Sequence, residues 1–282
     1  MLTRILTGVV ALVIFIPVLF LSHTVVFDIA IAFISLMGTL ELLKCVKILP
    51  KYAVSAPSAL VSFLVPLLFR YVQNEAIMLI VIAYLFYLLY AALFARKQNS
   101  TNDIALCFFA TVFVTISFTS IIITRDLEYG DILYLMIFIG AWSTDTFAYF
   151  TGKFFGRHKL PPPIRDVSPN KTMEGAAGGV VFCALAFVLY GFIVAKVNIE
   201  RFNAEPDYII LACAGLATAV IAQLGDLSLS AIKRNYGVKD YGAIFPGHGG
   251  ILDRFDSVMA VAPVVMIIGA IFLKFERYGL FT

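Results

Sequence analysis

Five acidic residues stand inside or at the ends of long apolar runs of this sequence, where an ionisable side chain is costly. They are Glu41, Asp145, Asp226, Asp253 and Asp256. Asp253 and Asp256 are three residues apart, so on a helix both carboxylates would point to the same side. Together with Asp226 they form an oxygen-only set of ligands, which suits a hard divalent cation such as Mg²⁺. The acids therefore predict a metal site, with simple ion pairing to nearby Lys and Arg side chains as the alternative.

A second pattern joins polar and basic residues to the first member of this set. Gln223, Asp226, Ser230 and Lys233 recur at steps of three and four residues. This spacing places them on one face of a predicted helix. The face combines a candidate metal ligand with side chains that can hold a phosphate group.

A glycine-rich loop lies between that helix and the last two acids. It reads Gly247-His248-Gly249-Gly250, and glycine lets backbone N–H groups approach a ligand closely, as phosphate-binding loops do. The helix that follows adds the positive end of its dipole. Loop, acids and basic residues together predict a site for a polyphosphate bound with a metal ion. The basic residues of this region are Lys233, Arg234, Lys239 and Arg254.

These residues belong to a chain that is mostly apolar. Of its 282 residues, 61% are apolar and 14% are charged, whereas soluble domains average roughly 45–50% and about 25%. This composition indicates an integral membrane protein and excludes a disordered chain, a secreted disulfide scaffold and a cytosolic enzyme with one buried core. The net charge of +3 is too small for a nucleic-acid footprint, so no nucleic-acid partner is expected.

Long runs with few charges predict membrane-spanning helices, since about 20 apolar residues cross a hydrocarbon core about 30 Å thick. We therefore expect an all-α, polytopic membrane protein with about nine transmembrane helices. The first run is expected to be a retained helix, because its apolar stretch is longer than the roughly 7–15 residues of a signal peptide core. The predicted spans are 5–27, 29–43, 52–69, 76–95, 104–124, 132–152, 175–195, 208–224 and 257–273.

The basic residues predict the orientation of these spans. Fifteen of the 21 Lys and Arg residues fall on the amino-terminal side and six on the opposite side. The positive-inside rule therefore places the amino terminus and the two longest loops, 153–174 and 231–253, in the cytoplasm. The membrane is expected to be the cytoplasmic (inner) membrane. Residues 1–128 are expected to form a lipid-facing scaffold and residues 129–282 the catalytic region. In the first of the two loops, Pro161-Pro162-Pro163 predicts a stiff, extended connector.

The sequence around the candidate site resembles the phosphatidate cytidylyltransferases, also called CDP-diacylglycerol synthases. The similarity is dense from about residue 142 to 257, while the segment 161–167 looks longer than in that family. The matching motifs are Trp142-x-x-Asp145-Thr146-Phe147-Ala148-Tyr149, Gly152-Lys153-x-Phe155-Gly156-x-His158-Lys159-Leu160, Ser168-Pro169-x-Lys171-Thr172-x-Glu174-Gly175, Ser230-x-x-Lys233-Arg234, Lys239-Asp240 and Pro246-Gly247-His248-Gly249-Gly250-x-x-Asp253-Arg254-x-Asp256-Ser257.

The resemblance implies a reaction of CTP with phosphatidate that gives CDP-diacylglycerol and pyrophosphate, with Mg²⁺ as cofactor and a second metal ion left open. The nucleophile would be the lipid phosphate, which is already anionic, so the site would need charge neutralisation more than a strong base. CTP and phosphatidate in the bilayer are therefore the expected partners.

The resemblance also implies roles for single residues. The metal ligands would be Asp226, Asp253 and Asp256. Lys171 would contact CTP or the lipid phosphate. His248 would either donate to the leaving pyrophosphate or form a structural hydrogen bond within the glycine-rich loop. The other expected phosphate or substrate ligands are Lys233, Arg234, Lys239, Arg254, Ser230, Gly249 and Gly250. For each basic residue, a role as a positive-inside anchor at the membrane surface is the alternative. Asp145 would order the polar cavity or pair with a basic residue.

Three alternatives stay open. A related CTP-dependent kinase of polyprenol or phytol would release CDP in place of pyrophosphate. A secondary transporter also carries acids within its membrane helices, although no inverted repeat is visible here. The third alternative is a homodimer. Gly175-x-x-x-Gly179 is a close-packing pattern that could join two copies of the chain, although packing within one chain is favoured.

Overall fold

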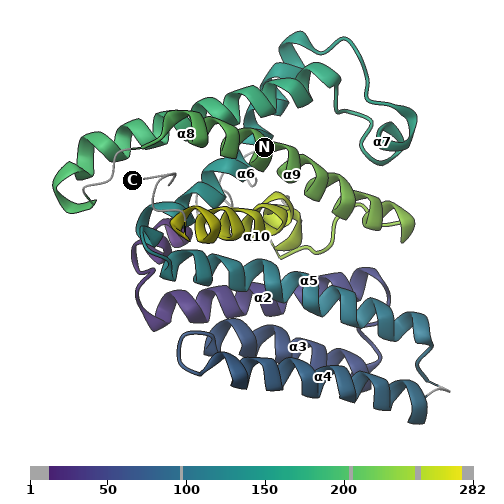
Figure 1. Cartoon of the computed structure of the whole chain (residues 1–282). Helices are drawn as coiled ribbons and strands as arrows, with labels where there is room; N and C mark the ends of the chain where they lie inside the picture. Colours follow the sequence, from purple (N-terminus) through teal and green to yellow (C-terminus); the bar gives the residue numbers. More distant parts are fainter. Residues whose placement is uncertain (1–12, 96–97, 203–205, 245–248, 275–282) are drawn as a thin grey trace. The chain divides into compact units, whose positions relative to one another are not determined.

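The computed structural model describes residues 13–95, 98–202, 206–244 and 249–274. These residues are mostly helical and contain no strand, and an isolated antiparallel bridge joins Lys159 to Thr172. The all-α class is therefore confirmed (Figure 1). Residues 13–20 are helical, and the helices that follow are α2 (Val25–Cys45), α3 (Tyr52–Leu68), α4 (Asn74–Phe94), α5 (Thr101–Asp126), α6 (Gly130–Phe155), α7 (Pro162–Val167), α8 (Met173–Phe202), α9 (Tyr208–Asn235) and α10 (Leu252–Lys274).

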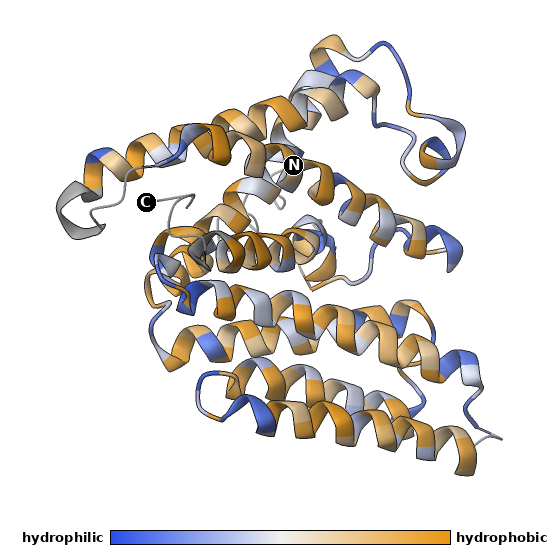
Figure 2. Cartoon of the chain, in the orientation of Figure 1, coloured by the Kyte–Doolittle hydropathy of each residue, from blue (hydrophilic) through white to orange (hydrophobic). Residues whose placement is uncertain are grey.

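Seven of the described helices are long and apolar enough to cross a membrane: α2, α4, α5, α6, α8, α9 and α10. Helix α3 is apolar but has 17 residues, and the first predicted span lies partly outside the described residues. A polytopic membrane protein is therefore confirmed, whereas the count of nine spans is not. Figure 2 shows hydrophilic residues at helix ends and in loops, with apolar residues along the helices between them. Only 22% of the α4 span is buried against the protein, as expected for a helix that faces lipid.

The prediction of an extended connector at the three prolines is wrong. Pro161 is extended and precedes helix α7, whose first two residues are Pro162 and Pro163. Proline has no N–H and a fixed φ near −65°, so the first turn of a helix, where N–H groups have no intrahelical acceptor, accommodates it. The prolines therefore start a short helix within the loop between α6 and α8.

The chain divides into two compact units. Unit 1 comprises Met1–Ile122 with Asn235–Phe255, and unit 2 comprises Ile123–Arg234 with Asp256–Thr282. The first boundary is near the predicted one at residue 128, but the segment Asn235–Phe255, with its glycine-rich loop, belongs to unit 1. The division of labour between scaffold and catalytic region stays a prediction.

In unit 1, α3 packs against α2 and α4, and hydrogen bonds join α5 to α3 and α4 (Figure 1). Its buried core contains large apolar side chains such as Phe27, Leu42 and Phe118. Hydroxyl groups are buried with them: Thr39 of α2 donates a hydrogen bond of 2.7 Å to Ser62 of α3, and Thr115 of α5 donates to the same oxygen. Such interhelical hydrogen bonds hold helices together where burial of apolar surface gives little driving force, as in lipid.

In unit 2, helices α6 and α8 approach each other closely at glycine residues of α8. A Cβ added at Gly175 of α8 would lie 2.7 Å from the Ala148 carbonyl oxygen of α6, and one at Gly179 would lie 2.9 Å from the Thr144 carbonyl oxygen. The prediction that Gly175-x-x-x-Gly179 packs within the chain is therefore confirmed. Helices α6 and α8 thus lie close enough to fix the ends from which the loop between them leaves.

Candidate functional site

The first group of predicted site residues lies in unit 2, around Asp226 of α9. Asp226 Oδ2 forms an ion pair with the ammonium group of Lys171. Its other carboxylate oxygen accepts a hydrogen bond of 3.3 Å from Ser230, one helical turn further along. The predicted helix face is therefore present, and it brings Lys171 of the preceding loop to the same carboxylate.

Two more predicted acids belong to this group. Asp256, half-buried on α10, interacts electrostatically with Asp226, Asp145 and Lys233. Ser257, the next residue, donates a hydrogen bond of 2.9 Å to Asp145 of α6. Three acids from α6, α9 and α10 therefore share one neighbourhood.

Small residues permit the approach of α9 to α10. A Cβ at Gly225 would lie 2.3 Å from the Cβ of Ala260, so a larger residue at position 225 would push the helices apart. Gly225 directly precedes Asp226, and Ala260 lies one turn beyond Asp256. The close packing therefore occurs next to the two carboxylates and helps to fix their positions.

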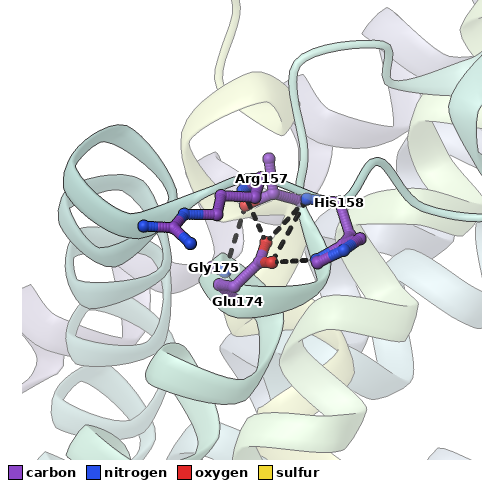
Figure 3. Close-up of polar contacts among 5 residues, drawn as sticks. Arg157, His158, Glu174 and Gly175 are labelled. Atoms are coloured by element: carbon purple, nitrogen blue, oxygen red, sulfur yellow. Dashed lines mark hydrogen bonds and ion pairs between the residues drawn. The ribbon is translucent and has the colours of Figure 1, made fainter.

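The loop that carries Lys171 is closed by Glu174, the second residue of α8. Figure 3 shows the Glu174 carboxylate facing the residues that follow α6. It accepts hydrogen bonds from the N–H groups of Arg157 (3.1 Å) and His158 (3.2 Å), and it lies 2.6 Å from His158 Nδ1. The Met173 N–H also donates to the His158 carbonyl oxygen. These contacts join the two ends of the loop. They therefore restrict the position of Lys171, which lies two residues before the start of α8.

Sequence reasoning gave no role to Glu174 or His158. The signal that could have found the first was an acidic residue in the first turn of a helix, where carboxylates interact favourably with the dipole. The partner could not be predicted, because the N–H groups involved lie 16 and 17 positions earlier in the sequence.

The second group of predicted residues lies in unit 1, around Asp253 in the first turn of α10. Asp253 is buried, and its Oδ2 accepts hydrogen bonds from the N–H groups of Tyr241 (2.8 Å) and Gly250 (2.9 Å). Gly249 has φ +87°, and a Cβ there would meet the Asp253 carboxylate at 2.8 Å. Asp253 thus joins Tyr241 to Gly250 as well as being a candidate metal ligand.

Glu41 of α2 changes the interpretation of the same helix start. Its two carboxylate oxygens accept hydrogen bonds from the N–H groups of Ile251 (3.0 Å) and Leu252 (2.9 Å). The expectation that this helix start would offer its N–H groups to a phosphate does not hold for these two residues, because a carboxylate of the chain itself already receives them. Sequence reasoning noted Glu41 as an acid within a span but gave it no role.

The remaining predicted residues differ in exposure. Lys233 is 8% exposed, which favours a role inside the protein over that of a membrane-surface anchor. Arg234 is exposed and donates to the Val167 carbonyl oxygen at 3.3 Å, while Lys239 and Arg254 are exposed. His248 lies outside the described residues, so its predicted role stays a prediction.

Unit 2 offers carboxylates, the kind of ligand that a hard cation such as Mg²⁺ takes. Among the described residues, no three His, Cys, Asp or Glu side chains meet closely enough to enclose a metal ion by themselves. Mg²⁺ does not require such an enclosure, because it keeps several waters and is bound by one or two carboxylates with substrate phosphates. Asp226, which forms the ion pair with Lys171, and Asp256 could supply those carboxylates.

Comparison with known proteins covers nearly the whole chain. Residues 2–272 match the Cytidylyltransferase family. The chain is 36% identical over 267 residues to a phosphatidate cytidylyltransferase of Staphylococcus saprophyticus, covering 94% of this chain and 97% of the relative. It is 35% identical over 278 residues to a protein of the same name from Bacillus subtilis, covering 95% and 97%.

Proposed function

Because the chain belongs to the cytidylyltransferase family, we propose that it is the enzyme that transfers the cytidylyl group of CTP to phosphatidate, giving CDP-diacylglycerol and pyrophosphate. The observation that carries the proposal is the similarity, along more than nine-tenths of the chain, to proteins named phosphatidate cytidylyltransferase. The acids and bases described above supply the chemistry that such a reaction needs.

The reaction is a displacement at the α-phosphorus of CTP. A phosphate oxygen of phosphatidate forms a bond to this phosphorus, while the bond from the same phosphorus to the oxygen bridging to the β-phosphate breaks. Pyrophosphate leaves with the electron pair of that bond. The attacking oxygen is already anionic, so the main barrier is the approach of two negatively charged groups.

The basic residues of unit 2 can reduce the repulsion between the two negatively charged substrates. Lys171 and the buried Lys233 place positive charge near the Asp226 and Asp256 carboxylates. We expect Lys171 to leave its ion pair with Asp226 and bind a substrate phosphate, since charge-assisted hydrogen bonds from ammonium to phosphate are strong. A Mg²⁺ ion held by Asp226 and Asp256 would neutralise charge on the phosphates. That Asp253 also binds a metal ion stays a prediction.

The location of the site follows from the substrates. CTP is soluble, whereas phosphatidate is a membrane lipid, so the site must be reached from water and from the bilayer. We propose that the protein lies in the inner membrane with the loop between α6 and α8 and the loop between α9 and α10 in the cytoplasm, as the distribution of Lys and Arg predicts. Both loops carry candidate phosphate ligands, Lys171 and Lys239.

The test follows the fate of the phosphates. The purified protein in detergent micelles is incubated with phosphatidate, Mg²⁺ and CTP labelled at either the α- or the γ-phosphate. We expect the α-label to enter the lipid fraction as CDP-diacylglycerol and the γ-label to appear in pyrophosphate, in equal amounts. Both products should depend on phosphatidate.

The alternatives give different results. A CTP-dependent lipid kinase would transfer the γ-label to the lipid and leave the α-label in CDP. A transporter would leave CTP intact and would take up its substrate in proteoliposomes without nucleotide. Either outcome would overturn the proposed function.

A further inference from the structure

Glu41 is a buried carboxylate in an apolar helix, and its side chain reaches the start of another helix. Glu41 is 6% exposed. Its hydrogen-bond donors, the N–H groups of Ile251 and Leu252, lie 210 and 211 positions away in the sequence. All three residues belong to unit 1. The carboxylate therefore caps α10 from outside its own segment, a role that local sequence does not encode.

The glycines around Glu41 leave space for it. A Cβ at Gly242 would lie 2.2 Å from Glu41 Oε1, and a Cβ at Gly250 would lie 2.3 Å from the same atom. Neither position can carry a side chain while the carboxylate stays in place. Two glycines of the segment thus have a physical reason that does not involve a bound phosphate.

Glu41 and Asp253 act on the same short segment. Asp253 receives the N–H groups of Tyr241 and Gly250, and Glu41 receives those of Ile251 and Leu252. Together the two carboxylates bind four N–H groups that flank residues 242–249. They therefore hold Tyr241 and the segment Gly250–Leu252, at which α10 begins.

A charged group at this position is costly for stability. A buried carboxylate loses its hydration, and a second carboxylate, Asp253, binds N–H groups of the same short segment. An uncharged cap such as Ser or Asn would satisfy a helix N-terminus without that cost. The presence of Glu therefore points to a requirement for a rigid, bidentate hold on Ile251 and Leu252.

We propose that Glu41 is a positioning residue of the reaction: by fixing the start of α10, it sets the direction in which the Asp253 side chain leaves that helix. This inference rests on the proposed function. Glu41 contacts no substrate in this role and acts through the backbone of Ile251 and Leu252.

The main test compares Glu41→Gln with Glu75→Gln, a matched change at an exposed residue in the first turn of α4. Gln keeps the shape but replaces one acceptor with a donor, so one of the two N–H groups loses its partner. We expect kcat to fall by about tenfold or more and the KM for CTP to change by less than about threefold, since the loss affects the transition state more than ground-state binding. Amide hydrogen exchange at 250–252 should become faster. Glu75→Gln should behave as the wild type in all three measurements.

A purely structural role gives another pattern. In that case the yield or the melting temperature in detergent falls, while kcat per folded enzyme stays at the wild-type value, and the proposal is overturned. If Glu41→Gln does not fold, Glu41→Asp replaces it, because it keeps the charge and shortens the reach by one methylene. A reduced kcat at an unchanged melting temperature then supports the proposal, and a wild-type kcat contradicts it.

A double-mutant cycle tests the contact itself. Gly250→Ala should lower kcat strongly in the wild type, because the new methyl group collides with Glu41. In a Glu41→Ala background this collision is absent, so Gly250→Ala should add little further loss. If the two losses multiply, Glu41 and Gly250 act independently and the proposal fails. Absence of any CDP-diacylglycerol synthesis by the wild type would instead overturn the proposed function.

Discussion

Lys171 and Asp226, 55 positions apart in the sequence, form an ion pair in unit 2. Both side chains are partly exposed, with exposed fractions of 31% for Lys171 and 21% for Asp226. A phosphate competes with Asp226 for the ammonium group, and Mg²⁺ competes with Lys171 for the carboxylate. The pair is therefore the contact that we expect substrate binding to change most.

The first prediction concerns this pair. Lys171→Met and Asp226→Asn should each lower kcat/KM by about 100-fold or more, and the double variant should be little worse than the poorer single variant, because residues that act as a unit are not additive. The measurement is synthesis of CDP-diacylglycerol in micelles. Lys196→Met, at an exposed residue of α8, is the control and should retain full activity. Recovery of activity in the double variant would show that the pair has only a structural role.

Much of the fold could be predicted from the sequence, because membrane spans depend on a local property. A run of about 20 apolar residues is enough to indicate a helix across the bilayer, and seven predicted spans coincide with long apolar helices. The prolines at 161–163 are an exception, because a proline run is extended in isolation, whereas Pro162 and Pro163 form the first turn of α7. The sequence pattern did not distinguish these two uses.

The candidate site was predictable only in part. The face of Asp226 and Ser230 follows from helical periodicity and is present. The pairing of Lys171 with Asp226, and the caps formed by Glu174 and Glu41, depend on segments brought together by tertiary packing. No spacing rule links Glu41 to a loop more than 200 positions away, so a residue important for the loop could be noted but not assigned.

The second prediction concerns the packing of α6 against α8. Gly175→Ala places a methyl group 2.7 Å from the Ala148 carbonyl oxygen, so the helices must separate. We expect a loss of about 1–3 kcal/mol, the usual cost of overpacking, seen as a lower melting temperature in detergent. Ala177→Val, at an exposed position of the same helix, is the matched control and should leave the melting temperature unchanged. Equal melting of both variants would contradict the tight contact.

The third prediction concerns Asp253. Asp253→Asn keeps an oxygen that can accept from Tyr241 and Gly250, so both N–H groups should keep their acceptor, but it removes the negative charge. We expect turnover to fall by about 100-fold or more, because the charge of this carboxylate takes part in the proposed reaction. Asp240→Asn, at an exposed residue of the same loop, should cause a milder loss. Turnover and melting temperature are measured together, and a wild-type turnover for Asp253→Asn would remove this residue from the list of metal ligands.

The fourth prediction concerns orientation. Single cysteines at the exposed positions Arg157 and Lys239, in a background without native cysteines, should be protected from an impermeant thiol reagent in intact cells and labelled after lysis. A cysteine at the exposed Glu128, between α5 and α6 on the predicted external side, should be labelled in intact cells. The reverse pattern would show that the positive-inside interpretation is wrong.

The last prediction concerns the metal ion. Removal of divalent cations by EDTA should abolish turnover, and Mg²⁺ should restore it, because charge on the phosphates must be neutralised before they can meet. Asp226→Asn removes the carboxylate that already holds a cation, the Lys171 ammonium group, so excess Mg²⁺ should not rescue it. Asp256→Asn leaves Asp226 in place, so its activity should rise as Mg²⁺ increases, with half-maximal activity at about tenfold higher Mg²⁺ or more. Titration of turnover against Mg²⁺ measures both. Full activity of both variants at wild-type Mg²⁺ concentrations would mean that neither carboxylate binds the metal, and the reaction would then depend on Lys171 and Lys233 for its positive charge.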